Sequence, residues 1–143
     1  TVDLTLRYKG YVSDATRTFG LGSISKEAIT VYEIVKESQK AGLKAVRPQK
    51  TCASVDDACR KIIEEHNYGP HFIHSTGHGI GLDVHESPNI SAKSKEKLKK
   101  DMTITVEPGI YIPKKFGVRI EDSLIVKDRA AVMHKFTKDL IVI

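Results

Sequence analysis

The sequence contains no apolar run close to the roughly 18 residues that would cross a bilayer. It shows no basic segment followed by an apolar stretch, so no signal peptide is visible. Internal repeats and low-complexity segments are missing as well. Of the 143 residues, 40% are hydrophobic and 29% are charged, which argues against long disorder, collagen and coiled coil. We therefore expect a cytoplasmic globular protein without a membrane partner.

Cysteine is scarce, and its spacing matches no metal site. Cys52 and Cys59 are the only two, and they lie too far apart for the short intervals of zinc-binding pairs. Cys59 falls at an apolar position of an expected helix, and Cys52 falls just before that helix. We interpret both as reduced packing residues of a cytoplasmic protein, without a disulfide between them.

Charge of one sign is only slightly in excess, since 23 basic and 18 acidic residues leave a net charge of +5. The densest basic stretch, residues 91–100, holds five lysines and one glutamate. Such a stretch is either a phosphate-binding patch or a solvated surface. It contains no aromatic residue on which a base could stack. We therefore interpret it as a solvated surface and expect no nucleic-acid partner.

Apolar periodicity predicts strands and two helices. Residues 2–8 and 11–19 alternate like two strands that meet near Gly10. Ser25 is the expected N-cap of a helix that runs to about Val46, and Ser54 is the expected N-cap of a second helix. Further strands are expected later in the chain, over Met102–Val106, Ile110–Pro113, Gly117–Lys127 and Ala131–Ile143. This order predicts an α+β fold in which helices cover one face of a largely antiparallel sheet.

Four acidic residues occupy or adjoin strand interiors, which strands disfavour. They are Asp3, Asp14, Glu107 and Glu121. A carboxylate that points into a core is unfavourable unless it is paired or bound to a cation. Any one of them alone is most simply a solvent-facing or ion-paired residue. Four in one short chain favour a shared metal site.

A second signal is the segment from residue 72 to residue 86, which is rich in histidine and glycine. His74, His78 and His85 lie within twelve residues, among three glycines that let the backbone turn sharply. Four carboxylates would balance two divalent cations, and oxygen-rich ligation with one imidazole suits Mn, Fe, Co or Zn. Ligand type alone does not choose among these metals.

These residues resemble the metal-ligand motifs of the pita-bread metallopeptidases, a family that includes methionine aminopeptidases, aminopeptidase P and prolidase. The matching motifs cover nearly the whole chain: Asp3 and Asp14 eleven residues apart, His78 in Thr76-Gly77-His78-Gly79, Glu107 before Pro108-Gly109, and Glu121 after Arg119-Ile120. The resemblance implies two divalent metal ions. In that scheme Asp3 binds one ion, Asp14 and Glu121 bridge both, and His78 and Glu107 complete the other.

The resemblance also implies a mechanism and roles for neighbouring residues. A hydroxide shared by the two metals would attack the scissile carbonyl, and Glu107 would carry the proton to the leaving nitrogen. His85 would donate a hydrogen bond to the carbonyl oxygen, and His74 would line the prolyl side of the pocket. Arg119 would either bind the substrate carboxylate or orient the ligating carboxylates. Thr16 and Thr105 are candidates for hydrogen bonds to those carboxylates.

Smaller cues place the chain nearest to the proline-specific branch, and within it to prolidase. The run from His74 to Glu86 is similar to that branch, whereas a methionine aminopeptidase more typically has cysteine before Gly-His-Gly. The resemblance thus implies hydrolysis of Xaa-Pro dipeptides. Aminopeptidase P, which acts on longer Xaa-Pro peptides, is the alternative. A second alternative is a pita-bread module that only binds protein or nucleic acid. Methionine aminopeptidase is a third and weaker alternative.

The resemblance finally bears on domain organisation. Residues 1–143 resemble the C-terminal part of a pita-bread catalytic domain, so we expect an N-terminal domain and the first part of the catalytic domain to be absent. We expect the residues alone to expose a sheet edge and an apolar helix face, to fold poorly and to be nearly inactive. The full-length protein is expected to be a homodimer that binds a small peptide substrate.

Overall fold

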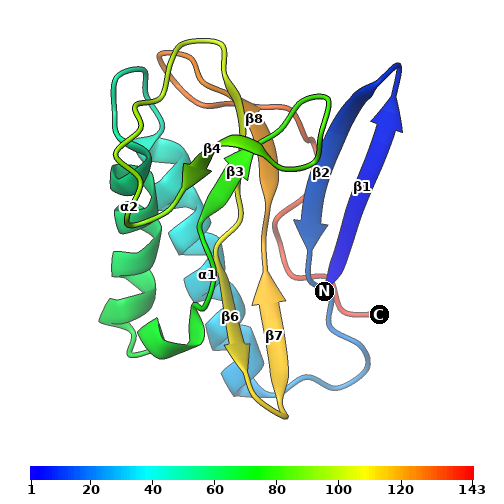
Figure 1. The fold of residues 1–143 in the computed structure, drawn as a ribbon. Helices are drawn as coiled ribbons and strands as arrows, with labels where there is room; N and C mark the ends of the chain where they lie inside the picture. Colours follow the sequence, from blue (N-terminus) through cyan, green and yellow to red (C-terminus); the bar gives the residue numbers. More distant parts are fainter.

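A hairpin of two long strands begins the chain. The computed structural model describes all residues, Thr1–Ile143. Strand β1 (Val2–Tyr8) pairs antiparallel with β2 (Tyr11–Arg17), so the predicted hairpin is confirmed, although its second strand ends two residues early. Lys9 and Gly10 form the turn with φ of 49° and 88°, which suits a two-residue hairpin. In Figure 1 the hairpin stands on one side of the sheet and the helices on the other.

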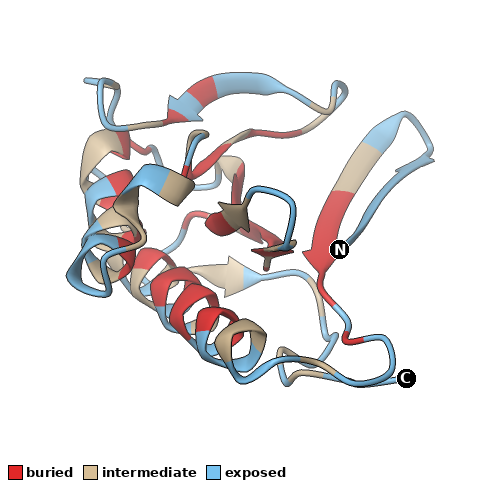
Figure 2. Ribbon diagram, turned by 90° about the horizontal axis from the view of Figure 1, so that it is seen from below, coloured by how far each residue is buried: buried red, intermediate tan, exposed pale blue.

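Helix α1 (Lys26–Ala45) confirms its prediction. The Ser25 hydroxyl accepts a hydrogen bond from the backbone N–H of Ala28, and Val46 is the C-cap. Buried residues such as Val31, Val35 and Ser38 recur at spacings of three and four, and Figure 2 shows this buried face in red. The helix therefore covers the sheet with one face, as its periodicity predicted.

The expected start of the second helix is wrong by three residues. Helix α2 (Cys52–Glu65) is capped by Thr51, whose hydroxyl accepts from the backbone N–H of Ser54. Ser54 lies inside the first turn, and its own hydroxyl donates to the carbonyl of Thr51. Thr51 and Ser54 are both good cap residues three positions apart, so the pattern fitted either start. Cys52 is thus the first helical residue, and both cysteines are buried and free.

A five-stranded antiparallel sheet forms the centre of the molecule, in the order β4-β3-β5-β8-β9. Its strands are β3 (Gly77–Gly79), β4 (Glu86–Ile90), β5 (Thr103–Val106), β8 (Asp122–Ile125) and β9 (Ala131–Val132). A short 3-10 helix (Gly69–His71) precedes β3, and β6 (Gly109–Ile112) and β7 (Phe116–Arg119) form a separate hairpin. Nineteen buried residues form one hydrophobic core that includes both helices and the sheet. The α+β class is confirmed.

Two expected strands differ from the structure. Gly117–Lys127 is broken at Ile120 and Glu121 into β7 and β8. Ala131–Ile143 is a strand only at Ala131–Val132 and then runs as irregular backbone to an isolated bridge at Val142. Its carbonyls between residues 136 and 138 accept hydrogen bonds from side chains, such as those of Arg17 and Tyr32, rather than from a neighbouring strand.

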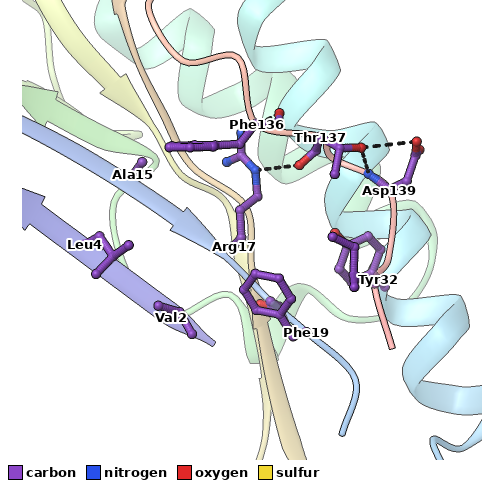
Figure 3. Close-up of a pocket in the computed structure, with 11 residues that line it drawn as sticks. Val2, Leu4, Ala15, Arg17, Phe19, Tyr32, Phe136, Thr137 and Asp139 are labelled. Carbon is purple, nitrogen blue, oxygen red and sulfur yellow. Dashed lines mark hydrogen bonds between the residues drawn. The ribbon is translucent and has the colours of Figure 1, made fainter. Parts of the chain in front are cut away.

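Strand β1 is an exposed edge. All seven of its residues are exposed, including Val2, Leu4 and Leu6. Val2 and Leu4 face Phe19 and Tyr32 across an apolar cavity of about 260 Å³, shown in Figure 3. The two helices expose only one large hydrophobic side chain, Ile29, so the expected exposed apolar helix face is not found. Neither helix combines the length and apolarity that a membrane crossing requires.

Candidate metal centre

Three side chains from distant parts of the sequence meet at one point. Asp14 lies on β2, His78 on β3, and Glu121 between β7 and β8. Each offers a ligand atom, and these atoms all lie within 4.8 Å of one another. Asp14 and Glu121 are buried, and His78 is half-buried. Three of the five residues expected to hold metal are therefore assembled around one point.

Glu107 lies beside this trio, at the end of β5. Its Oε1 is 3.3 Å from the Nε2 of His78, and the same Nε2 is 4.0 Å from Oδ2 of Asp14. The Nδ1 of His78 is 2.9 Å from the carbonyl oxygen of Gly79, which leaves Nε2 facing the carboxylates. An imidazole held in this way presents one nitrogen to a metal and fixes the other.

Asp3 approaches these four residues from the neighbouring strand, β1. It pairs with Thr16 across the hairpin, while Thr5 pairs with Asp14, so all four side chains lie on one face. The carboxylate of Asp3 accepts a hydrogen bond of 2.6 Å from Nη2 of Arg119. Asp3 is half-exposed and lies outside the tight trio.

Threonine hydroxyls orient the carboxylates. Thr16 donates to Glu121 at 2.6 Å, and Thr105 donates to Glu107 at 3.2 Å, which confirms the two hydrogen bonds considered from the sequence. Thr5 donates to Asp14 at 3.1 Å and was missed. Its position opposite Asp14 in the hairpin register was the signal that could have found it.

We call Asp3, Asp14, His78, Glu107 and Glu121 the acidic cluster. Without a cation, this cluster is electrostatically strained. Burial, and then repulsion from Glu107, raise the pKa of Glu121 to about 8. Burial also raises the pKa of Asp14, with a further contribution from Asp3. Burial opposes a charge on His78, but its hydrogen bond to Glu107 leaves its pKa raised overall. Carboxylates whose ionised forms repel one another in this way fit a divalent cation, which would favour all of the ionised forms at once.

A polar cavity of about 670 Å³ opens beside the cluster, and it contains the expected substrate residues. Its lining includes His74, His78, His85, Glu107 and Arg119. The ring of His85 lies 4.3 Å from that of His78, centroid to centroid. The structure thus brings the expected catalytic and substrate-binding residues to one cavity.

Tyr111 was missed, and it joins two of these residues. Its hydroxyl lies 2.8 Å from Nε2 of His74 and accepts a hydrogen bond of 2.9 Å from Nη1 of Arg119. Gly109 is the register partner of Arg119 and lies two residues before Tyr111, which therefore shares the face of Arg119. Arg119 also donates to Thr16 at 3.3 Å, so it contacts the carboxylate of Asp3 directly and that of Glu121 through Thr16.

Two glycines allow the strands of the site to approach closely. A side chain on Gly77 would collide with the backbone carbonyl of Thr105, and one on Gly79 with that of Ser87. Both glycines flank His78. The Gly-His-Gly sequence therefore places the imidazole where neighbouring backbones leave no room for larger residues.

Comparisons with known proteins agree with this geometry. The family model described as metallopeptidase family M24 matches residues 1–128. An Xaa-Pro dipeptidase from Pyrococcus furiosus is 48% identical over 91% of this chain and 37% of its own length. Among solved structures, a dipeptidase from Pyrococcus horikoshii has a TM-score of 0.96 and 45% identity, covering 99% of this chain and 40% of the other. An X-Pro aminopeptidase from Thermotoga maritima has a TM-score of 0.95 and 38% identity, covering 99% and 40% respectively.

The chain thus spans about two fifths of the length of these relatives. The family match over residues 1–128 spans the positions of Asp3, Asp14, His78, Glu107 and Glu121. The fold, with its curved antiparallel sheet and covering helices, is the pita-bread fold of the prolidases. This chain belongs to metallopeptidase family M24.

Proposed function

We propose that this chain carries the metal centre of an Xaa-Pro dipeptidase, which hydrolyses the peptide bond before proline. The observation that carries the proposal is the meeting of Asp14, His78 and Glu121 within 4.8 Å, beside a cavity lined by further histidines. The identity of 48% to a dipeptidase from P. furiosus supports the same substrate class. An Xaa-Pro bond has no N–H, so its recognition must depend on the shape of the pocket and on the ends of the substrate.

The residues present fit two divalent cations. Asp3, Asp14, Glu107 and Glu121 supply four negative charges, and His78 supplies one nitrogen, a set that suits Mn, Co, Zn or Fe. We propose Asp14 and Glu121 as the bridging residues, with Asp3 on one ion and His78 and Glu107 on the other. Such a pair of ions supplies a water-derived nucleophile at neutral pH and polarises the carbonyl.

The chain's own residues would divide the remaining work. Glu107, at the edge of the cavity, would take a proton and return it to the leaving nitrogen. His85 would donate a hydrogen bond to the carbonyl oxygen of the substrate. His74 would border the proline ring. For Arg119, the contacts to Asp3, Thr16 and Tyr111 favour the orienting role over binding of the substrate carboxylate.

Steady-state hydrolysis by the full-length protein tests the substrate class. With Mn²⁺ or Co²⁺ present, we expect cleavage of Ala-Pro and Met-Pro. Cleavage of longer Xaa-Pro peptides alone would favour aminopeptidase P, a second candidate that the similarity to the T. maritima enzyme supports. Cleavage of Met-Ala but not of Met-Pro would instead indicate a methionine aminopeptidase.

A metal titration tests whether the chain is catalytic at all. A pita-bread module that only binds other molecules would take up no Mn²⁺, and its properties would not depend on Glu107. We expect about two Mn²⁺ ions per chain of the full-length protein, a stoichiometry typical of dinuclear sites. Glu107→Ala should abolish activity and weaken metal binding. Full metal uptake without any peptidase activity would contradict the proposed function.

We further propose that residues 1–143 form the C-terminal part of a pita-bread catalytic domain in a cytoplasmic homodimer. The chain covers about two fifths of the length of its relatives, which supports its assignment to part of a longer domain arrangement. The C-terminal placement, the homodimer and the location rest on the resemblance of the sequence to the family. Size-exclusion chromatography with light scattering on the full-length protein tests the dimer. A monomer at micromolar concentration would contradict it.

A further inference from the structure

The two carboxylates proposed as bridging ligands are held in a reciprocal way by their backbones. The carbonyl of Glu121 accepts a hydrogen bond of 2.6 Å from Nη1 of Arg17, a residue of β2. The carbonyl of Asp14 accepts one of 2.7 Å from the hydroxyl of Ser123, a residue of β8. Strand β2 therefore supplies a side chain that binds the backbone of Glu121, which directly precedes β8, and β8 supplies one that binds the backbone of Asp14 on β2.

Arg17 lies on the opposite face of β2 from the acidic cluster. Because strand side chains alternate, Asp14 and Thr16 face the cluster while Arg17 faces away, toward the apolar cavity of Figure 3. Its guanidinium makes five hydrogen bonds, two of them to the carbonyls of Thr16 and Glu121. A guanidinium has five N–H donors in a fixed plane, so this arrangement defines the spacing of its acceptors.

Asp122 holds Arg17 in place. Its carboxylate is fully buried and accepts from Nη2 of Arg17 at 2.7 Å. The other oxygen accepts from Nε2 of Gln39 on α1 at 2.9 Å and lies 2.5 Å from Nζ of Lys138. We call these four residues, Arg17, Asp122, Gln39 and Lys138, the Arg17–Asp122 clamp. None of them lines the polar cavity beside the acidic cluster.

We propose that the Arg17–Asp122 clamp positions Asp14 and Glu121 for metal binding, from behind the sheet and without touching metal or substrate. The proposal rests on the proposed function, because it takes both carboxylates as ligands of the same metal pair. Asp14 on β2 and Glu121, which directly precedes β8, must keep a fixed separation to bind one metal pair. Arg17 spans that separation, because its Nη1 donates to the carbonyls of both Thr16 and Glu121. Its members are positioning residues.

The irregular C-terminal segment, residues 133–143, also contacts the Arg17–Asp122 clamp. The carbonyl oxygens of residues 136 and 137 accept hydrogen bonds from the guanidinium of Arg17, at 3.3 and 2.9 Å, and Lys138 contacts Asp122. Figure 3 shows Thr137 beside the guanidinium of Arg17. No residue of this segment lines the polar cavity, yet through Arg17 and Asp122 the segment contributes to the geometry of the acidic cluster.

Metal titration of full-length Arg17→Lys, by calorimetry with Mn²⁺ alone, tests the proposal. Lysine keeps the charge but loses the planar donors, and loss of such an outer partner lowers metal affinity by about 10-fold or more. We also expect the spectroscopic signal of two coupled Mn²⁺ ions to weaken. Arg60→Lys is the matched control, because Arg60 also binds a buried aspartate, Asp56, but contacts no residue of the acidic cluster. It should bind Mn²⁺ like the wild type.

Unchanged Mn²⁺ affinity in Arg17→Lys, or an equal loss in Arg60→Lys, would overturn the proposal. If Arg17→Lys does not fold, Lys138→Met decides, because it removes the ammonium group that contacts Asp122 and Gln39 and leaves Arg17 in place. We expect it to weaken Mn²⁺ binding less than Arg17→Lys, and wild-type affinity in it would count against the clamp. A wild-type protein that binds no Mn²⁺ would instead refute the proposed function.

Discussion

At the scale of single residues, hydroxyl groups and one phenol organise the acidic cluster. Thr5, Thr16 and Thr105 each donate to a different carboxylate, and Tyr111 joins His74 to Arg119. The three threonine hydroxyl groups orient the carboxylate oxygens without adding charge to the cluster. Their loss should therefore change how well a cation is held more than whether the chain folds.

Thr16→Val removes the shortest of these hydrogen bonds with almost no change in shape. We expect about a 10-fold loss of Mn²⁺ affinity, because outer hydrogen-bond partners of metal ligands typically contribute that much. The measurement is a calorimetric titration of the full-length protein. Thr30→Val, at an exposed position on α1, is the control and should bind as the wild type does. Equal affinities in all three proteins would show that Thr16 has no orienting role.

His85→Ala tests the oxyanion role assigned to the exposed histidine. Its ring packs on His78 and forms no hydrogen bond to a carboxylate. We expect kcat on Met-Pro to fall by about 100-fold or more, the usual effect of removing one oxyanion donor. Mn²⁺ affinity should stay near the wild-type value. A variant that lost metal and kept kcat at saturating Mn²⁺ would show that His85 supports the metal ligand instead.

At the scale of elements, α2 fixes the loop that carries His74. Arg60 donates to the carbonyls of Phe72 and His74 at 3.0 and 3.1 Å, and it pairs with the buried Asp56. Asp56 also accepts from the backbone and the hydroxyl of Thr76, which starts the path into β3. A helix outside the cavity thereby sets the position of one cavity wall.

Arg60→Lys should consequently weaken substrate binding through His74. We expect KM for Met-Pro to rise about 10-fold, which corresponds to one charge-assisted hydrogen bond of about 1.5 kcal/mol. The measurement is a kinetic double-mutant cycle with His74→Ala. In the His74→Ala background, Arg60→Lys should have little further effect. Additive effects of the two substitutions would mean that Arg60 acts by another route.

Local patterns sufficed for the hairpin, α1 and the α+β class, because strand alternation and helix periodicity are written in neighbouring residues. They failed where hydrogen bonds run to side chains far along the sequence. Residues 131–143 are expected as a strand, yet the carbonyls of residues 136 and 137 accept hydrogen bonds from Arg17, more than a hundred positions earlier. Likewise, Thr5 and Tyr111 reach the site because of how their strands pair with neighbouring strands. The sequence of a single strand does not reveal this pairing register.

At the scale of the whole molecule, the acidic cluster ties stability to pH. Glu121 titrates near 4.5 in an unfolded chain and at about 8 in the folded, metal-free one. Between these values the folded state binds more protons than the unfolded state, so the free energy of unfolding falls as pH rises. The folded protein is therefore under most strain at the pH where its carboxylates are ionised and no cation is present.

Metal-free full-length protein should accordingly lose thermal stability from about pH 5 to pH 8. Added Mn²⁺ should reverse the loss, since a ligand that binds only the folded state stabilises it. Melting temperatures measured across this range with and without EDTA check both statements. In Glu121→Gln the metal-free decline should be smaller. A decline of the same size in that variant would place its origin in other groups.

The pairing register of the β1–β2 hairpin decides which of its side chains face the acidic cluster. Alternate residues of β1 face opposite sides, so a shift of one residue in its pairing would turn Asp3 and Thr5 away from the acidic cluster. The turn at Lys9 and Gly10 sets the correct alignment. A misaligned hairpin would present Asp14 without Asp3. If the proposed metal site is correct, only chains with the correct alignment would gain the full stabilisation from bound ions.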